Sequence, residues 1–341
     1  MTKKKISVLG AGSWGATLAS HLCRIGHEVA LWEFDPEAAR KLDTTRRLGV
    51  LPQLKIPPEM RVTSDLKEAL LPGPDVLLCV VPSHFVRSTM EAIVKENLFP
   101  KSAPVISASK GIEQKTLLRM TQVIAQICPA AEGRLAVLSG PSHAEEVALG
   151  LPTAVDIASR NDAIAQAVIP LFASETFRVY TNPDPVGVEL GGALKNVYAI
   201  ACGVADGLKL GDNAKAALIT RGLLEMGRLG KKLGARVETF FGLAGVGDLI
   251  VTCASQHSRN RLLGEKIGMG KNLQQALSEM TMVAEGVKTT ESAYQLAQAN
   301  GVDVPLIQEV YLCLYKGKKA LDSLHDLLRR AVHSEMEDLF K

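Results

Sequence analysis

Aromatic residues are scarce in this sequence, since Phe, Trp and Tyr make up only 4% of its 341 residues. So few aromatic side chains argue against the stacking platforms that hold single-stranded nucleic acids. The charge balance is also nearly even, because 39 Lys and Arg residues oppose 36 Asp and Glu residues, a net charge of +3. Proteins that bind nucleic acids typically carry a strong local excess of basic residues. We therefore expect no nucleic-acid partner.

The cysteines and histidines lack the spacings of metal sites. None of the six cysteines forms a C-x-x-C pair, and most lie in apolar runs, which indicates buried free thiols in a reducing cytoplasm. The seven histidines show no H-x-x-x-H spacing and have no cysteine at ligand distance along the chain. We expect neither disulfides nor a bound metal, and a cytoplasmic location.

Long apolar runs are missing as well. No uninterrupted run approaches the ~18 residues of a membrane span, and no basic amphipathic helix is evident, so we expect no stable membrane association. The start of the chain, Lys3–Lys5 followed by an apolar segment, resembles a signal peptide. The alternative is a first strand that runs into a glycine turn, and the specific spacing of the glycines favours that strand.

The composition is that of a globular protein, with 47% hydrophobic and 22% charged residues, and the length suggests about two domains. In the first half, short β-rich runs alternate with helical stretches. The run VLLCVV (76–81) is apolar throughout, as a strand buried on both faces should be. Such alternation is typical of a mostly parallel, doubly wound sheet. The expected strands cover 6–10, 28–33, 76–82, 104–109, 135–140, 153–159 and 177–182.

Helical patterns replace the strands after about residue 183. The expected helices cover 185–209, 213–233, 258–268, 272–280, 286–299, 305–316 and 320–330. Asn300-Gly301 and Lys316-Gly317 are typical helix ends. We therefore predict an α/β doubly wound domain in residues 1–188 and an all-α domain in residues 189–341.

A glycine turn of the form G-x-G-x-x-G spans residues 10–15, directly after the first expected strand and directly before a helix. In this context Gly10 allows the tight turn, Gly12 lets the backbone approach a pyrophosphate, and Gly15 lets the helix pack on the strand. The helix start also presents free N–H groups to phosphates. We interpret the first domain as a dinucleotide-binding Rossmann domain, and the alternative is a glycine-rich packing turn.

The second expected strand ends in carboxylates that could hold the adenine ribose. Glu33 and Asp35 are both candidates, and a carboxylate at this place favours NAD over NADP. Arg40, Arg46 and Arg47 are close in sequence, however, and could meet the 2′-phosphate of NADP. The sequence therefore predicts NAD(H), NADP(H) or both as cofactor.

Lys195 is the one charged residue in an apolar helical stretch, residues 190–205. Its neighbours three, four and seven positions further along are Tyr198, Ala199 and Cys202. Burying a lysine is costly unless it is paired or functional, and burial lowers a lysine's pKa toward the range that suits proton transfer. The alternative is a lysine that reaches the surface or pairs with a core carboxylate. Asn196 adds a neutral hydrogen-bonding group beside it.

A polar, glycine-rich segment covers residues 242–264 in the otherwise helical half. Asp248 and Thr252 are four residues apart, so one helical turn would place them on the same face. Ser258 can cap the next helix, and Arg259 and Asn260 at a helix start would suit a phosphate group. The alternative is ordinary capping combined with a surface salt bridge.

Two further candidates follow strands of the expected sheet. Lys110 comes directly after strand 104–109, and Gly140 and Ser142 come at and after the end of strand 135–140. Because ligands gather at the carboxyl ends of strands in such sheets, these residues are candidate contacts.

Several segments together resemble one family. They are VLGAGSWG, VVPSH, SASKGIE, LSGPSHAEE, GLPTAV, LGGALKNVYAI, TRGLLEMGRLG, GLAGVGDLIVTC, HSRNR and VAEGVKT. From about residue 5 to 330, the chain resembles the bacterial NAD(P)-dependent sn-glycerol-3-phosphate dehydrogenases. The resemblance implies a dinucleotide-binding domain, an all-helical substrate domain and an active site between them. It also implies reduction of dihydroxyacetone phosphate to sn-glycerol 3-phosphate for phospholipid synthesis, by a homodimer.

The resemblance assigns roles to the residues above. It implies that Lys195 is the catalytic proton donor and acceptor, and we expect Asp248 and Lys110 to assist it. The expected cofactor contacts are Gly10, Gly12, Ser13, Trp14, Gly15, Lys110, Ala144, Arg259, Val283 and Glu285. The expected substrate contacts are Lys110, Gly140, Ser142, Lys195, Asn196, Asp248, Thr252, Ser258, Arg259 and Asn260.

One position departs from the family pattern. Phe34 stands where many members carry His or Arg, a basic side chain that would help bind a 2′-phosphate. Two alternatives to the family reading remain open. One is a β-hydroxyacid or 6-phosphogluconate-type dehydrogenase, and the other is a module that binds the nucleotide without turnover.

Overall fold

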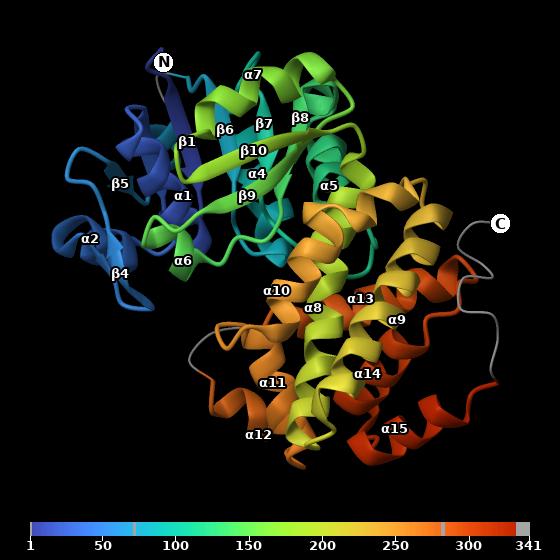
Figure 1. The fold of residues 1–341 in the computed structure, drawn as a ribbon. Coiled ribbons are helices and arrows are strands. Elements are labelled where there is room, and N and C mark those ends of the chain that lie inside the picture. Colours follow the sequence, from blue (N-terminus) through green and yellow to red (C-terminus); the bar gives the residue numbers. More distant parts are fainter. Residues whose placement is uncertain (1, 71–72, 281–283, 332–341) are drawn as a thin grey trace. The chain divides into compact units, whose positions relative to one another are not determined.

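The computed structural model describes residues 2–70, 73–280 and 284–331. The chain forms two compact units, drawn in Figure 1. The N-terminal unit consists of residues 1–110 and 120–185, and the C-terminal unit consists of residues 111–119 and 186–341.

An eight-stranded sheet forms the centre of the N-terminal unit, with strand order β10-β9-β8-β7-β6-β1-β2-β5. Its strands are β1 (Lys5–Leu9), β2 (Glu28–Trp32), β5 (Arg61–Thr63), β6 (Val76–Cys79), β7 (Val105–Ser107), β8 (Leu135–Ser139), β9 (Thr153–Ala158) and β10 (Phe177–Asn182). Pairing is parallel except between β8 and β9, so β9 and β10 run against the other strands. The order from β5 to β8 is that of a doubly wound dinucleotide-binding sheet. The predicted fold class is confirmed.

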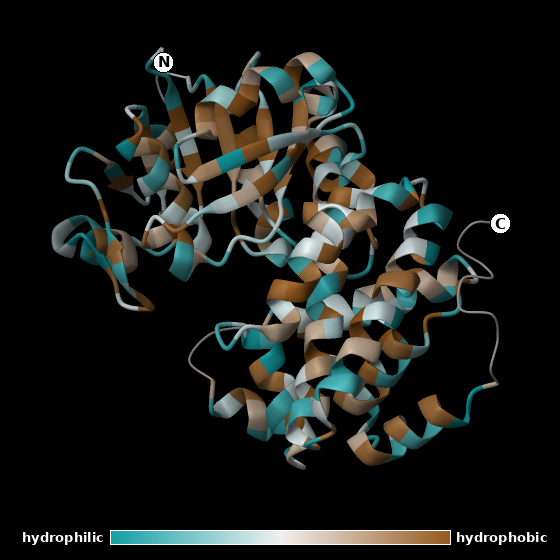
Figure 2. Cartoon of the chain, viewed as in Figure 1, coloured by the Kyte–Doolittle hydropathy of each residue, from teal (hydrophilic) through white to brown (hydrophobic). Residues whose placement is uncertain are grey.

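The strands of this sheet carry the core of the unit. All four residues of β6 are buried, and Figure 2 shows the central strands in the brown of hydrophobic residues. The helices of this unit are α1 (Ser13–Arg24), α2 (Pro36–Thr45), α3 (Leu66–Leu70), α4 (Val86–Lys95), α5 (Met120–Ile127), α6 (Ala144–Ala148) and α7 (Asp162–Phe172). Strands covered by helices need apolar residues on both faces, which explains the unbroken apolar run that predicted β6.

Three short strands were not predicted from the sequence. They are β3 (Arg47–Leu48), β4 (Leu51–Lys55), which pairs with β3 in a separate antiparallel hairpin, and the edge strand β5. The chain can leave helix α2 and enter this hairpin because Arg46 adopts a left-handed conformation with φ 52° at the helix end. Strands β3 and β5 have only two and three residues, too few for a periodic pattern, and Pro52 interrupts the run of β4.

The C-terminal unit is helical, as predicted. Its helices are α8 (Pro185–Gly207), α9 (Gly211–Lys232), α10 (Asp248–Ala254), α11 (Arg259–Gly268), α12 (Leu273–Ser278), α13 (Gly286–Ala299), α14 (Pro305–Lys316) and α15 (Ala320–Arg329). Helix α8 is buried along almost its whole length, so the other helices pack around it. No helix in the described residues has both the length and the apolar character that crossing a membrane requires.

Helices α8 and α11 approach each other closely enough for backbone contact. A Cβ atom at Gly203 would overlap the carbonyl oxygen of Arg261, and one at Gly264 would overlap that of Ile200. Only glycine leaves room for two helices at this separation. This close approach brings the start of α11 beside the middle of α8, where Lys195 and Asn196 lie.

The C-terminal unit is not continuous in sequence. Residues 111–119 lie between two elements of the N-terminal unit in sequence, yet they belong to the C-terminal unit. Ile112 is 3% exposed and lies in the helical core, and Arg119 forms an ion pair with Glu189 of α8. Tertiary contacts of this kind leave no periodic signal in the sequence.

All six cysteines are free, and four of them are buried. Within the described ranges, no group of three or more His, Cys, Asp or Glu side chains is arranged to hold a metal ion.

Candidate active site

The glycine turn has the geometry that a dinucleotide site needs. Gly10 has φ +102°, and a Cβ atom there would lie 3.0 Å from the backbone nitrogen of Val81. A Cβ atom at Gly15 would overlap the carbonyl oxygen of Gly10. The turn follows β1, and β1 and β6 are the neighbouring strands at which the sheet order reverses. Ligands of doubly wound sheets bind at this switch point.

The start of α1 offers unused hydrogen-bonding groups. Gly12 precedes the helix without any side-chain cap, and a Cβ atom there would meet nothing within 4 Å. The Ser13 hydroxyl and the Trp14 indole nitrogen are buried and have no hydrogen-bond partner. Buried polar atoms without a partner are costly unless a ligand satisfies them. Open space, free backbone donors and two unpaired polar atoms therefore fit the pyrophosphate of a nicotinamide dinucleotide.

The two candidate ribose-binding carboxylates differ in their local contacts. Asp35 Oδ1 accepts a hydrogen bond from the Glu37 backbone N–H at 2.9 Å and caps α2. Glu33 directly follows β2, and its Oε1 accepts from the Asp35 backbone N–H at 3.2 Å. Each carboxylate thus accepts one backbone N–H and keeps its other oxygen for a ribose hydroxyl, so both stay candidates.

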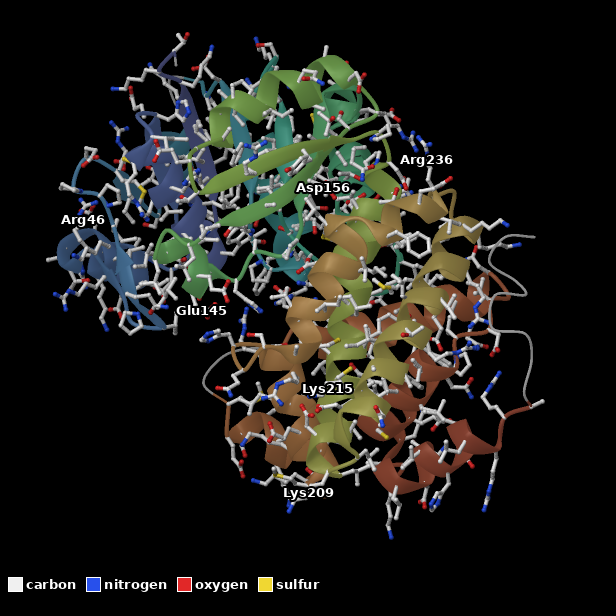
Figure 3. All side chains as sticks on the ribbon, in the orientation of Figure 1. Arg46, Glu145, Asp156, Lys209, Lys215 and Arg236 are labelled. Atoms are coloured by element: carbon white, nitrogen blue, oxygen red, sulfur yellow. The ribbon has the colours of Figure 1, made fainter. Side chains whose placement is uncertain are left out.

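Phe34 and Arg46 differ in what each could offer a 2′-phosphate. Phe34 is 79% exposed and packs edge-on against Trp32, with ring centroids 6.2 Å apart. Arg46, labelled in Figure 3, donates to Asp43 and to the carbonyl of Met60, each at 2.7 Å. The guanidinium of Arg46 therefore already has acceptors within the protein, and the exposed ring of Phe34 offers a phosphate no charge.

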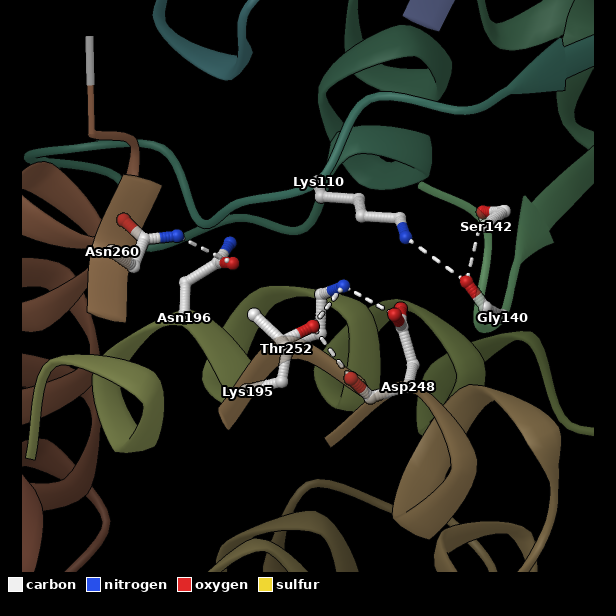
Figure 4. A network of polar contacts seen from close by, with 8 residues as sticks. All are labelled: Lys110, Gly140, Ser142, Lys195, Asn196, Asp248, Thr252 and Asn260. Atoms are coloured by element: carbon white, nitrogen blue, oxygen red, sulfur yellow. Dashed lines mark hydrogen bonds and ion pairs between the residues drawn. The ribbon is translucent and has the colours of Figure 1, made fainter. Parts of the chain in front are cut away.

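The carboxyl ends of β7 and β8 come together through polar contacts. Ser109 Oγ donates to the carbonyl of Val81 at 2.6 Å, which fixes the chain just before Lys110. Lys110 Nζ donates to the carbonyl of Gly140 at 3.4 Å, and Ser142 Oγ donates to the same oxygen at 2.9 Å (Figure 4). Lys110, Gly140 and Ser142 thus form one cluster within the N-terminal unit. Ala144 begins the short helix α6 beyond it and is buried.

A second cluster lies in the C-terminal unit around Lys195, which is only 7% exposed. Lys195 Nζ forms an ion pair with Asp248 Oδ1 and donates to Thr252 Oγ1 at 2.8 Å (Figure 4). The Thr252 hydroxyl in turn donates to the backbone carbonyl of Asp248 at 2.6 Å. Asp248 and Thr252 lie on one turn of α10, as their spacing predicted. A lysine that is buried and paired in this way is held with little positional freedom.

A chain of amide contacts lies one residue further along α8. The Gly286 N–H donates to Asn260 Oδ1 at 2.9 Å, and Asn260 Nδ2 donates to Asn196 Oδ1 at 2.9 Å. Because each amide oxygen is engaged as an acceptor, the orientation of both side chains is set. Asn196 Nδ2 is therefore presented as a donor.

The remaining predicted residues lie at helix starts. Ser258 caps α11, accepting from the Arg261 backbone N–H at 3.2 Å, and Arg259 is the exposed first residue of that helix. Glu285 directly precedes α13. Val283 lies outside the described residues.

Two glycines important to the cluster around Lys195 were not recognised from the sequence. A Cβ atom at Gly191 would overlap the carbonyl oxygen of Ala244, so this glycine lets α8 approach the turn that leads into Asp248. A Cβ atom at Gly286 would lie 2.7 Å from Asn260 Oδ1. The glycine pair in LGGALKN was the available signal for the first, whereas a single backbone N–H has no signature in a sequence.

Comparisons with known proteins agree with these features. Sequence models of the NAD-dependent glycerol-3-phosphate dehydrogenase N-terminus and C-terminus match residues 5–165 and 184–325. A glycerol-3-phosphate dehydrogenase (NAD(P)+) from Citrifermentans bemidjiense is 50% identical over 334 residues, which cover 97% of this chain and 99% of that protein. One from Bacillus pumilus is 47% identical over 338 residues, covering 98% of this chain and 97% of that protein.

A solved structure is similar along the whole chain. The crystal structure of glycerol-3-phosphate dehydrogenase from Coxiella burnetii is 38% identical, with a TM-score of 0.91, and the match covers 96% of this chain and 99% of that one. Sequence and structure therefore agree along both units. The chain belongs to the family of NAD(P)-dependent glycerol-3-phosphate dehydrogenases.

Proposed function

We propose that this protein catalyses the reversible, NAD(P)H-dependent reduction of dihydroxyacetone phosphate to sn-glycerol 3-phosphate. The observation that carries the proposal is the buried Lys195, paired with Asp248 and Thr252, in a unit that matches the C-terminal model of the family. A lysine ammonium held in this way can serve as a general acid, which the reduction of a ketone requires.

The proton transfer is assigned to Lys195. The nicotinamide, when bound, supplies a hydride to the carbonyl carbon. The electron pair of the C=O bond then moves onto the oxygen, and Lys195 donates a proton to that oxygen, which gives the alcohol. Asp248 holds the ammonium group in place and favours its charged form, and Thr252 fixes its orientation. In the reverse direction the neutral amine of Lys195 takes the proton back.

The phosphate of the substrate is assigned to the start of α11. Arg259 supplies charge, the helix start supplies backbone N–H groups, and Asn260 and Asn196 supply amides of fixed orientation. Binding a remote phosphate positions the reacting carbon relative to Lys195. We propose that Lys110 contacts both substrate and cofactor, with Gly140 and Ser142 beside it.

The cofactor is assigned to the N-terminal unit. Gly10, Gly12 and Gly15 shape the turn that would receive the pyrophosphate, with Ser13 and Trp14 as polar partners. Arg259, Val283, Glu285 and Ala144 remain proposed cofactor contacts, carried over from the family resemblance. We also propose a homodimer in the cytoplasm whose product supplies phospholipid synthesis.

The first experiment is a turnover assay with purified protein. Oxidation of NADH, and separately of NADPH, is followed with dihydroxyacetone phosphate, and unphosphorylated dihydroxyacetone is the control substrate. We expect turnover with the phosphorylated ketone alone. Equal use of both ketones would contradict the phosphate site. Turnover only in the opposite direction, with a panel of hydroxyacids and NAD+ or NADP+, would favour a β-hydroxyacid or 6-phosphogluconate-type dehydrogenase. Cofactor binding without any turnover would favour a module that binds the nucleotide without turnover.

A variant separates phosphate binding from chemistry. Arg259→Ala should raise KM for dihydroxyacetone phosphate by at least about tenfold with a much smaller change in kcat, because charge-assisted contacts to a remote phosphate contribute mainly to binding. Steady-state kinetics over a range of substrate concentrations measure both constants. A drop in kcat alone would move Arg259 from the phosphate to the reacting centre.

A further inference from the structure

The chain on the two sides of Lys110 is held by different parts of the molecule. On one side, Ser109 is buried and hydrogen-bonded to Val81 at the end of β6, within the N-terminal unit. On the other side, residues 111–119 belong to the C-terminal unit. Lys110 is thus the last residue of the N-terminal unit before the chain enters the C-terminal unit.

Residues 111–119, which we call the strap, form a compact loop with its own hydrogen bonds. Ile112 and Arg119 form an antiparallel bridge at its base. Within the loop, the Glu113 N–H donates to the carbonyl of Leu118 at 2.9 Å, and the Leu117 N–H donates to that of Glu113 at 3.0 Å. These contacts close the strap on itself.

The strap is fastened to the helices that carry the substrate cluster. Arg119 forms an ion pair with Glu189 of α8, and the two side chains are only 12% and 3% exposed. Glu189 precedes Lys195 by six residues on the same helix. At the other end of the strap, Gln114 Nε2 donates to Glu291 of α13 at 2.7 Å, and α13 also supplies the Gly286 N–H.

Apolar contacts and backbone strain also indicate that the strap is held in place. Ile112 lies in the core of the helical unit, and Leu117 packs against that core. Lys115 and Leu117 have φ values of +70° and +60°, a conformation that is costly for residues other than glycine. Such strain persists only where surrounding contacts determine the conformation, and it concentrates at functional sites. The strap is therefore held in one shape despite its cost.

We propose that the strap fixes the chain directly after Lys110, and that Arg119 and Glu189 are positioning residues for the reaction. This inference rests on the proposed function, in which Lys110 and Lys195 act on the same substrate. Neither Arg119 nor Glu189 is required to touch substrate or cofactor. Their ion pair acts through the short stretch of chain that joins it to Lys110.

The test compares loss of the ion pair with loss of Lys110. Arg119→Met should lower kcat by at least about tenfold, while the dissociation constant for NADH changes no more than it does in Lys110→Met, because the glycine turn is untouched. In a Lys110→Met background, the same substitution should have less than about a twofold further effect on kcat. Non-additivity of this kind is expected when one residue acts through the other.

A second variant separates positioning from folding. Arg119→Met leaves Glu189 buried without its ion pair, whereas Arg119→Met/Glu189→Met removes both charges and should restore the thermal midpoint. We expect kcat of the double variant to stay low. The matched control, Lys318→Met/Glu309→Met, removes a partly buried ion pair of the same unit, together with the contact of Lys318 to Asp326, and should keep kcat within about twofold of wild type.

The outcomes are distinct. Recovery of kcat together with the thermal midpoint in the double variant, or full additivity with Lys110→Met, would overturn the inference and leave the proposed function standing. An inactive wild type would overturn both. If Arg119→Met does not fold, two other variants replace it in the comparison with Lys110→Met. They are Arg119→Met/Glu189→Met and Gln114→Ala, which removes the contact to Glu291.

Discussion

The candidate sites of the two units consist of different kinds of chemical group. In the N-terminal unit, the site is mostly backbone: a glycine turn, open space at Gly12 and the free start of α1. In the C-terminal unit, it is mostly side chains, which come from α8, α10 and α11 and meet only in the folded protein. A backbone site is specified by a few consecutive residues, whereas a side-chain site depends on how distant helices pack. The two sites should therefore respond differently to substitution.

Replacing Lys195 should produce the largest effect. Lys195→Met removes the proposed proton donor and should lower kcat by about 10²- to 10⁴-fold, the range expected for loss of a general acid. Binding of NADH, measured by fluorescence titration, should be unchanged, because the glycine turn lies in the other unit. Lys215→Met is the matched control, since Lys215, labelled in Figure 3, forms a partly buried ion pair with Asp206 in the same unit. Near-normal turnover of Lys195→Met would remove this lysine from the chemistry.

The stability of the two units should depend on pH in opposite directions. Burial raises the pKa of Glu225 in α9 to about 7, although the backbone N–H groups of Leu306 and Ile307 oppose this shift. Because this folded-state pKa lies above the ordinary value of 4.5, the C-terminal unit should lose stability as pH rises from about 4.5 to about 7, by roughly 3 kcal/mol. Glu225→Gln should remove most of this dependence, measured by urea unfolding followed by circular dichroism.

The N-terminal unit provides the contrast. Burial lowers the pKa of His21 and of His27 from 6.5, so each imidazole is harder to protonate in the folded unit than in the unfolded chain. Protonation then favours the unfolded chain, and stability should fall as pH drops below about 6.5. Trp14 and Trp32 are the two tryptophans of the chain and both lie in this unit, so their fluorescence reports its unfolding separately. Parallel pH profiles for the two signals would contradict the contrast.

The same difference explains what the sequence could reveal. The glycine turn and the strands β1, β2 and β6 were predictable because each is specified by five to ten consecutive residues with a characteristic spacing. Lys195 was conspicuous as a lone charge in an apolar helix, but its partners Asp248 and Thr252 lie more than fifty residues away. The residues alone left its role open, and the family resemblance supplied the rest.

Other features left a misleading signal or none. The strap, GIEQKTLLR, is rich in helix-forming residues, and its sequence from residue 116 onward predicts a helix, whereas the structure begins α5 only at Met120. Only the folded protein shows that Arg119 pairs with Glu189. The contact of the Gly286 N–H with Asn260 depends on a backbone atom that every non-proline residue has. Contacts of this kind are fixed by tertiary packing. They can be predicted from the sequence only through its resemblance to known proteins.

Filling the space at Gly12 tests the backbone character of the N-terminal site. Gly12 has φ −64° and ψ 176°, which alanine can adopt, and its Cβ would meet nothing within 4 Å. Gly12→Ala should therefore leave the thermal midpoint unchanged while it raises the dissociation constant for NADH about tenfold, because the methyl group occupies the place of the pyrophosphate. Gly15→Ala, which forces an overlap with Gly10, should lower both stability and binding. Unchanged NADH binding by Gly12→Ala would place the pyrophosphate elsewhere.

The smallest expected effect concerns the one place where a side chain should decide cofactor choice in the N-terminal unit. Phe34 is exposed beside the end of β2, so replacing it should cost the fold little. Phe34→Arg places a guanidinium where a 2′-phosphate would lie and should shift the ratio of kcat/KM for NADPH over NADH upward by about five- to tenfold. Phe34→Gln, which removes the ring without adding charge, should leave that ratio within about twofold. If both variants behave alike, the contact that discriminates the two cofactors lies outside this turn. Cofactor choice would then not depend on the side chain at position 34, in keeping with the backbone character of the N-terminal site.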